Sequence, residues 1–184
     1  MAINVCIVGL GHAAKIHAEG YRLNKYTNLV GVYDINKSNS IKFKEKYNAK
    51  IIYNSFEEVI NDNEIHLIDI CTPTYLHAEY TEKSLIAGKH VHSEKPFCIN
   101  VEEGEKAANY ATIDNNIFVG ETYVYLSSHV KAKELIDANE IGKDTYPPNP
   151  KTISGFSFFI IKIDFKIEKK IIGNDKNFLI KFLF

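Results

Sequence analysis

The sequence lacks several features that mark specialised classes of protein. It has 22 Lys and Arg against 23 Asp and Glu, so no basic excess points to a nucleic-acid partner. It has no apolar run of the length, about 18 residues, that a membrane-spanning helix needs. The start, Met1–Val5, has no basic cluster, and we expect no signal peptide. What remains has the composition of an ordinary globular protein.

Cysteine is scarce, and its spacing offers no recognisable cluster. Cys6, Cys71 and Cys98 form no CxxC pair and leave an odd residue over, which favours free thiols in a reducing, cytoplasmic compartment. His90 and His92 share a strand face near Cys98, but no fourth ligand is evident. We therefore expect no metal site.

Alanine and valine disappear towards the C-terminus. All ten valines lie at or before Val130 and all twelve alanines at or before Ala138, whereas Ile, Phe and Lys fill 22 of the 34 positions after Pro150. Residues 144–184 are open to three interpretations: a β-hairpin remnant of a second domain, since apolar residues alternate over 159–167; an out-of-frame product of A+T-rich DNA; or an edge-pairing segment for self-association. The predicted organisation is a domain over 1–120, a connecting helical segment over 121–143 and this atypical tail.

Before the tail, strand and helix patterns alternate. Strands are predicted over 3–8, 29–33, 51–53, 66–70, 90–92 and 117–120, and helices over 13–24, 37–47, 56–61, 74–87, 100–114 and 128–138. Ser55 and Asn100 each precede a glutamate by three residues, as in a capping box, Thr74 is a predicted N-cap, and Gly88 suits a C′ position. This alternation predicts an α/β fold: a Rossmann-type, doubly wound parallel sheet with helices on both faces.

The turn after the first strand reads Gly9-Leu10-Gly11-His12-Ala13-Ala14, which matches G-x-G-x-x-A between a strand and a helix. Gly9 permits a tight turn, Gly11 lets the backbone approach a pyrophosphate, and Ala14 allows close packing of helix on strand. His12 lies over the pyrophosphate or is an exposed loop residue. The motif predicts a dinucleotide site; the alternative is an incidental glycine turn.

Asp34 ends the second strand, where a dinucleotide site needs an acceptor for the adenosine ribose hydroxyls. Its carboxylate would repel a 2′-phosphate, so NAD is favoured over NADP, although Lys37 could soften that repulsion. The alternative is that Asp34 only caps the next helix.

Glu94-Lys95-Pro96 directly follows the fifth strand. The proline ends the strand and holds Lys95 extended, at the carboxyl edge of the sheet where ligands of such folds bind. A lysine there can hydrogen-bond a substrate hydroxyl and help take its proton. A purely structural lysine is equally compatible with the spacing.

Over about residues 3–143 the chain resembles the Gfo/Idh/MocA oxidoreductase family, whose namesakes are glucose–fructose oxidoreductase and inositol dehydrogenase. The residues that carry the resemblance are Val8-Gly9-Leu10-Gly11, His17-Ala18, Val32-Tyr33-Asp34, Ile70-Cys71-Thr72-Pro73-Thr74-Tyr75-Leu76-His77, Ala87-Gly88-Lys89-His90-Val91, Glu94-Lys95-Pro96, Leu135-Ile136 and Glu140-Ile141-Gly142-Lys143.

The resemblance implies an NAD(P)-dependent dehydrogenase that passes hydride from a secondary alcohol of a sugar or polyol to nicotinamide C4. It implies a catalytic role for Lys95, contact of Glu94 with the nicotinamide region, and a cofactor-lining role for Cys71, Thr72, Pro73, Thr74 and His77.

Two departures from the family pattern bear on activity. Thr74 stands where the family often has Asn, which keeps a hydrogen-bonding group. No histidine follows His129, so the D-x-x-x-H helix of the family's second domain is missing. The alternative function is therefore a truncated, catalytically incompetent NAD-binding module.

Overall fold

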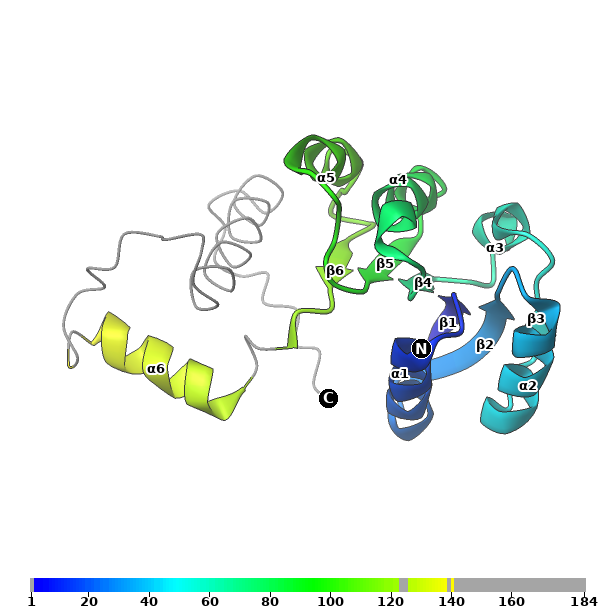
Figure 1. The fold of residues 1–184 in the computed structure, drawn as a ribbon, viewed down its shortest axis with the longest axis horizontal. Coiled ribbons are helices and arrows are strands. Elements are labelled where there is room, and N and C mark those ends of the chain that lie inside the picture. Colours follow the sequence, from blue (N-terminus) through cyan, green and yellow to red (C-terminus); the bar gives the residue numbers. More distant parts are fainter. Residues whose placement is uncertain (1, 123–125, 139, 141–184) are drawn as a thin grey trace. The chain divides into compact units, whose positions relative to one another are not determined.

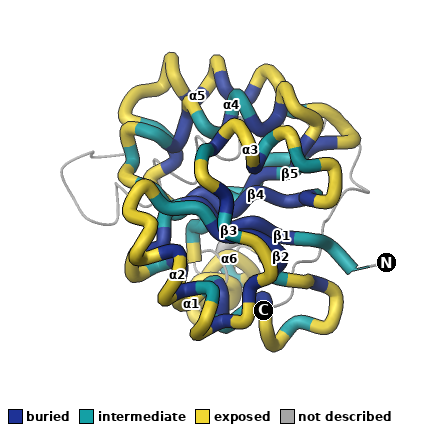
Figure 2. Tube along the Cα trace, turned by 90° about the vertical axis from the view of Figure 1, so that its right-hand side faces the viewer, coloured by how far each residue is buried: buried dark blue, intermediate teal, exposed yellow. Residues whose placement is uncertain are grey.

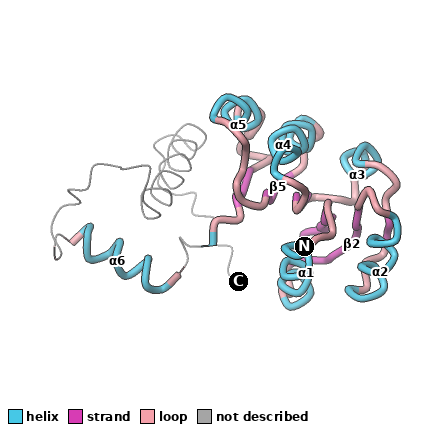
Figure 3. The backbone as a smooth tube through the Cα atoms, in the orientation of Figure 1, coloured by secondary structure: helices cyan, strands magenta, loops and turns pink. Residues whose placement is uncertain are grey.

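The computed structural model describes residues 2–122, 126–138 and 140 (Figure 1). Its elements are β1 (Ile3–Val8), α1 (His12–Leu23), β2 (Thr27–Tyr33), α2 (Lys37–Tyr47), β3 (Ile51–Ile52), α3 (Phe56–Asn61), β4 (Leu67–Ile70), a 3₁₀ turn η1 (Thr74–Leu76), α4 (His77–Ile86), β5 (His90–Ser93), α5 (Val101–Ala108), β6 (Ile117–Val119) and α6 (Ser127–Asp137). Strands and helices alternate along the chain, as Figure 3 shows.

The strands form one sheet in the order β3-β2-β1-β4-β5-β6, and every neighbouring pair is parallel. From β1, the strands that follow first along the chain lie on one side, and those from β4 onward lie on the other, so the order in which strands are added reverses between β1 and β4. This is the strand order of the Rossmann fold, in which ligands bind outside the carboxyl ends of the strands at the reversal point. The predicted doubly wound α/β fold is confirmed.

Helices cover both faces of the sheet because the central strands are apolar on both sides. Val5 and Ile7 of β1 pack in one cluster with residues of α1 and α2, whereas Cys6 and Val8 pack in a second cluster with residues of α3 and α4. In Figures 1 and 2, α1 and α2 lie on one side of the strands and α3, α4 and α5 on the other, with the buried strands between them. The alternation along β1 thus supplies both cores.

Two predicted helix boundaries are wrong. Thr74 is not an N-cap: the carbonyl of Pro73 accepts from the Leu76 N–H at 3.0 Å, Thr74–Leu76 form the 3₁₀ turn, and α4 begins at His77. The helix predicted over 100–114 ends at Ala108. There the Asn115 side chain accepts from the Thr112 N–H at 3.0 Å and donates to the Leu85 carbonyl at 2.6 Å, so these bonds hold a turn in place of further helix.

The other predicted caps are confirmed. Ser55 Oγ accepts from the Glu58 N–H at 3.1 Å, and Asn100 Oδ1 accepts from the Glu103 N–H at 2.9 Å. Gly88 follows α4 with a φ of 75°, the left-handed conformation that glycine adopts without strain.

Among the described residues, the sheet and its helices belong to one compact unit that ends at Gly120, and α6 belongs to a second unit. The tail over 144–184, with its proposed hairpin, lies outside the described residues.

Candidate functional site

The glycine turn and the loop after β4 are in backbone contact at the carboxyl edge of the sheet. Gly9 has a φ of 85°, and a Cβ on it would come within 2.8 Å of the Cys71 carbonyl carbon and the Thr72 nitrogen. Because both obstacles are backbone, no side-chain movement could make room. Gly9 therefore lets two predicted cofactor loops, after β1 and after β4, meet directly.

Gly11 is open where Gly9 is crowded. Apart from Gly11 and its immediate chain neighbours, no atom of the described residues is found within 4 Å of the position that a Cβ on Gly11 would take. Gly11 is also the N-cap of α1, and no side chain caps that helix. The first N–H groups of α1 are thus available to an anionic ligand, next to a backbone that a ligand can approach closely. His12, the first residue of α1, is exposed, Ala13 is half-buried and Ala14 is buried.

Asp34 lies beside the glycine turn at the end of β2. Its Oδ2 accepts from the Leu10 N–H at 2.8 Å, and its Oδ1 accepts from the Asn36 N–H at 2.8 Å. Asn36, not Asp34, is the N-cap of α2, so the capping alternative for Asp34 is wrong. Lys37 Nζ donates to Asn54 Oδ1 at 3.4 Å. Asp34 is therefore held in place by the backbone of the turn that it would serve.

His77 connects the loop after β4 to the loop after β5. The ring is buried, with Nε2 at 2.7 Å from the Thr72 carbonyl oxygen and Nδ1 at 2.8 Å from the Pro96 carbonyl oxygen. Of the other residues predicted in the first loop, Cys71, Thr72 and Thr74 are half-buried and Pro73 is exposed. Thr72 Oγ1 is a buried atom with no hydrogen-bond partner among the described residues.

Glu94 and Lys95 lie at the end of β5. The Lys95 N–H donates to Glu94 Oε2 at 3.0 Å, the Lys95 side chain is exposed, and the bond to Pro96 is cis. The structure thus brings the glycine turn, Cys71–Thr74, His77 and Glu94–Lys95 together at the carboxyl ends of β1, β4 and β5. Asp34 joins them through Leu10.

A buried polar network that the sequence interpretation missed lies directly below this edge. Asp69 of β4 has no exposed side-chain surface; its Oδ2 is 2.9 Å from His17 Nδ1, and its Oδ1 is 3.1 Å from His92 Nδ1. His17 Nε2 is in turn 3.2 Å from Glu94 Oε1. The two imidazole rings stack with their centroids 4.9 Å apart, and the Tyr21 hydroxyl lies 3.3 Å from His92 Nδ1.

The groups of this network shift one another's pKa values. Burial by itself would lower the pKa of His17, but hydrogen bonds to Asp69, Cys71 and Glu94 outweigh it and raise that pKa to about 12. Burial would raise the pKa of Asp69, yet His92 and His17 hold it well below its usual range. The hydrogen bond from His17 lowers the pKa of Glu94. Burial and Asp69 raise the pKa of the Cys71 thiol to about 12, which leaves it protonated and unreactive.

Register explains how three elements build this network. Ile7, Asp69 and His92 pair across β1, β4 and β5, so their side chains share the face that α1 covers. One potential metal-ligand atom from each of His17, Asp69 and His92 lies within 4.8 Å of the others, a separation at which three side chains can share a cation. Those atoms are engaged in the ion pairs above, so we describe the group as an ion-paired network. The only sequence signals were His17 as a family marker and the strand position of His92.

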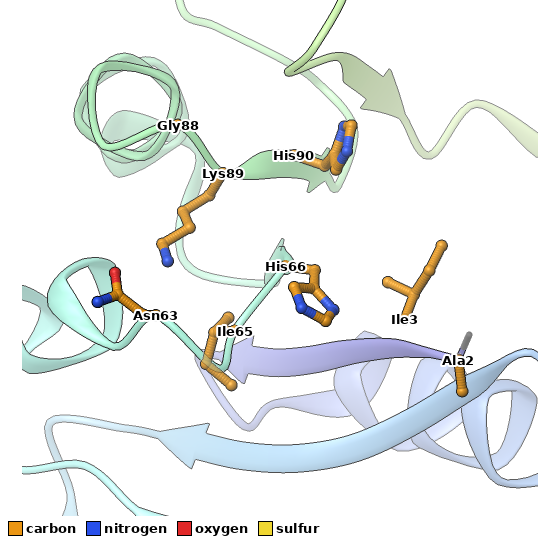
Figure 4. Close-up of a pocket in the computed structure, with 8 residues that line it drawn as sticks. All are labelled: Ala2, Ile3, Asn63, Ile65, His66, Gly88, Lys89 and His90. Atoms are coloured by element: carbon orange, nitrogen blue, oxygen red, sulfur yellow. The ribbon is translucent and has the colours of Figure 1, made fainter.

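A shallow pocket of about 400 Å³ lies at the opposite, amino edge of the sheet. Figure 4 shows its lining residues, among them His66, Lys89 and His90. His66 Nδ1 accepts from the Asn4 N–H and His90 Nδ1 from the Asn116 N–H, both at 3.1 Å. These histidines therefore accept hydrogen bonds from backbone N–H groups near the starts of neighbouring strands, and they do not belong to the predicted site.

A glycine turn with an uncapped helix N-terminus, and a carboxylate at the end of the next strand, define a dinucleotide-binding domain of the Rossmann class. A sequence model of the oxidoreductase family GFO_IDH_MocA, NAD-binding Rossmann fold, matches residues 3–122. The chain therefore belongs to the Gfo/Idh/MocA oxidoreductase family and carries its NAD-binding domain, as the resemblance predicted.

Characterised relatives are longer than this chain. Glucose-6-phosphate 3-dehydrogenase of Bacillus subtilis is 34% identical over 137 residues, which cover 74% of this chain and 38% of that enzyme. Myo-inositol 2-dehydrogenase of Thermotoga maritima is 27% identical over 192 residues, which cover 94% of this chain and 56% of that enzyme. Scyllo-inositol dehydrogenase of Lactobacillus casei, solved with NAD(H) and scyllo-inositol, matches with a TM-score of 0.72 and 26% identity, over 77% of this chain and 43% of that one.

The described residues fit an NAD cofactor on three structural grounds. Gly11 leaves room for a close backbone approach, the N-cap of α1 makes no side-chain hydrogen bond, and Thr72 Oγ1, in the loop that meets Gly9, is buried without a hydrogen-bond partner among the described residues. The three cysteines form no disulfide. Among the helices of the described residues, none combines the length and hydrophobicity needed to cross a membrane.

Proposed function

We propose that the chain is the cofactor half of an NAD-dependent sugar or polyol dehydrogenase. The observation that carries the proposal is that Gly11, Asp34 and Lys95 follow the carboxyl ends of β1, β2 and β5, at the edge of the sheet where the strand order reverses. The family relatives that act on glucose 6-phosphate and on inositols support a sugar or polyol as substrate.

Each residue has a role that follows from its position. The N-terminus of α1 binds the pyrophosphate, Asp34 accepts the adenosine ribose hydroxyls, and Thr72 Oγ1 donates to the cofactor. NAD, when bound, accepts hydride from a secondary alcohol. Exposed Lys95 hydrogen-bonds the alcohol and helps take its proton.

The second candidate is an NAD-binding module without turnover. The observation that favours it is that the family model matches residues 3–122 and describes an NAD-binding Rossmann fold, so the region that is matched binds the cofactor. For the tail, the match to the Thermotoga enzyme covers 94% of this chain and so extends past residue 143, which supports a second-domain remnant over a changed reading frame. The Ile- and Phe-rich composition of the tail supports self-association. The absence of a disulfide among Cys6, Cys71 and Cys98 supports a cytoplasmic location.

Calorimetry with NAD, followed by an assay for NADH over a panel of sugars and cyclitols, separates the two candidates. Saturable binding with turnover supports the dehydrogenase, and binding without turnover on every panel member supports the module. Absence of binding contradicts both.

Gly11→Ala sharpens the binding test. Because a methyl group there meets no described atom, we expect the free energy of unfolding to stay close to that of the wild type. The same methyl group would stand between the backbone and the pyrophosphate, so we expect NAD affinity to fall by about 10-fold or more. Unchanged affinity in this variant would contradict the placement of the pyrophosphate.

Asp34→Ala tests the choice of cofactor. Loss of the carboxylate removes an acceptor for the ribose and the repulsion of a 2′-phosphate, so NAD binding weakens and the preference for NAD over NADP shrinks by about 10-fold. Asp114→Ala, in an exposed loop, is the matched control. Competition calorimetry with both dinucleotides measures the ratio.

A further inference from the structure

We propose that His17 is a positioning residue: as an imidazolium held between Asp69 and Glu94, it fixes the Glu94–Lys95 loop against the cofactor-binding helix α1. The inference rests on the proposed function only for the role of Lys95 and of α1. The hydrogen-bonded arrangement itself is a property of the described residues.

Both ring nitrogens of His17 face carboxylates. Nδ1 lies 2.9 Å from Asp69 Oδ2 and Nε2 lies 3.2 Å from Glu94 Oε1. A carboxylate offers only acceptors, so each nitrogen must carry a proton for both contacts to be hydrogen bonds. A neutral imidazole has one N–H and would leave one contact as a repulsion between lone pairs.

Asp69 makes the inner end of this bridge rigid. It is fully buried on β4, in the middle of the sheet, where Oδ2 meets His17 and Oδ1 meets both His17 and His92. The hydroxyl of Tyr21, one turn after His17 on α1, lies 3.3 Å from His92 Nδ1. Cys71 Sγ, 3.4 Å from His17 Nδ1, completes the groups that face the ring. Among the contacts of the His17 ring with described residues, two are with carboxylates, one is with a thiol and one is with the stacked ring of His92.

Glu94 carries the bridge to the lysine. One of its oxygens meets His17 and the other accepts from the Lys95 N–H at 3.0 Å. Removing His17 would free Glu94 to rotate into solvent, and the Lys95 backbone would lose its restraint. A route of hydrogen bonds thus runs from α1, whose N-terminus binds the pyrophosphate, to the residue that meets the substrate.

The protonation state is read directly from the ¹⁵N and ¹H resonances of the histidine rings in the whole chain. We expect both His17 nitrogens to be protonated from about pH 6 to about pH 9, far above the range of an ordinary histidine. Glu94→Gln should bring the titration of His17 down towards neutral pH, whereas Glu102→Gln on α5 should not. A wild-type ring with one bare or metal-bound nitrogen at neutral pH would overturn the inference.

Positioning is read from amide hydrogen exchange. His17→Gln replaces two charged donor nitrogens on opposite sides of a ring with one neutral amide nitrogen. In this variant we expect exchange of the Lys95 amide to speed up about 10-fold, while the Leu10 amide, held by Asp34, keeps its rate. Equal rates at Lys95 in the variant and the wild type would overturn the inference. Neither measurement needs NAD, so their failure is distinguishable from a failure of the proposed function, which calorimetry with NAD reports.

Discussion

At the scale of single residues, Gly9 and Gly11 show how one motif combines two demands. The α-carbon of Gly9 faces the backbone of the loop after β4, whereas that of Gly11 faces open space. The first glycine thus serves packing within the chain, and the second serves approach by a ligand.

Gly9→Ala should therefore destabilise the fold, in contrast to Gly11→Ala. The methyl group would lie 2.8 Å from backbone atoms of Cys71 and Thr72, on a residue with a φ of 85°. We expect the free energy of unfolding to fall by roughly 1–3 kcal/mol. Urea denaturation of both alanine variants measures the difference, and equal losses would contradict it.

Residues in local motifs were predictable from the sequence, and residues in the buried network were not. Gly9, Asp34 and Glu94 each follow a strand directly, so a strand prediction is enough to place them at one edge. His17, Asp69 and His92 come from α1, β4 and β5, and they meet only because the register aligns two strand positions on the face that α1 covers. No spacing along the chain encodes that alignment.

At the scale of elements, side-chain caps decide where the short helices begin. Asn100 caps the start of α5 through two hydrogen bonds with Glu103. Its Oδ1 accepts from the Glu103 N–H and its Nδ2 donates to Glu103 Oε1, each at 2.9 Å. Where a tertiary contact or a proline competes, as at Pro73 and Asn115, the boundary moves away from the one that the sequence indicates.

Asn100→Ala should lower the free energy of unfolding by about 1 kcal/mol, because it leaves the first-turn N–H of Glu103 without its partner. Asn109→Ala, at the other end of α5, is the control and should cost less. Urea denaturation with an unchanged slope reports the change; equal costs for the two variants would argue against the cap.

At the scale of the whole molecule, layers follow from sequence periodicity. The apolar strands and amphipathic helices before residue 120 predict two cores with a sheet between them, and both cores are present. The positions of the buried ionisable side chains follow from how the layers pack and not from sequence periodicity. These side chains determine how the stability of the fold changes with pH.

Stability should peak near neutral pH. Burial and the neighbouring His66 lower the pKa of His90 from 6.5, so the unfolded chain binds the extra proton and stability falls as pH drops below about 6.5. Further loss follows in stronger acid, where Asp69 and Glu94, whose pKa values are lowered, are protonated.

On the alkaline side the sign reverses. His17 has a pKa raised from 6.5 to about 12, so its contribution is complete below about pH 6.5 and is lost as pH rises towards 12. Thermal melts across the pH range give the profile. His17→Gln should flatten the alkaline limb and His90→Gln the limb just below neutral pH, and a wild-type profile that rises steadily towards alkaline pH would contradict the network.

The sheet is long at its centre and short at its margins: β1 has 6 residues, whereas the marginal strands β3 and β6 have 2 and 3. A strand of another molecule that docked on either margin would find only a few backbone groups to pair with. In the crowded conditions of overexpression, growth of fibrils by strand addition at β3 or β6 is therefore disfavoured. Fibril inhibitors designed against this domain should not aim at those two strands.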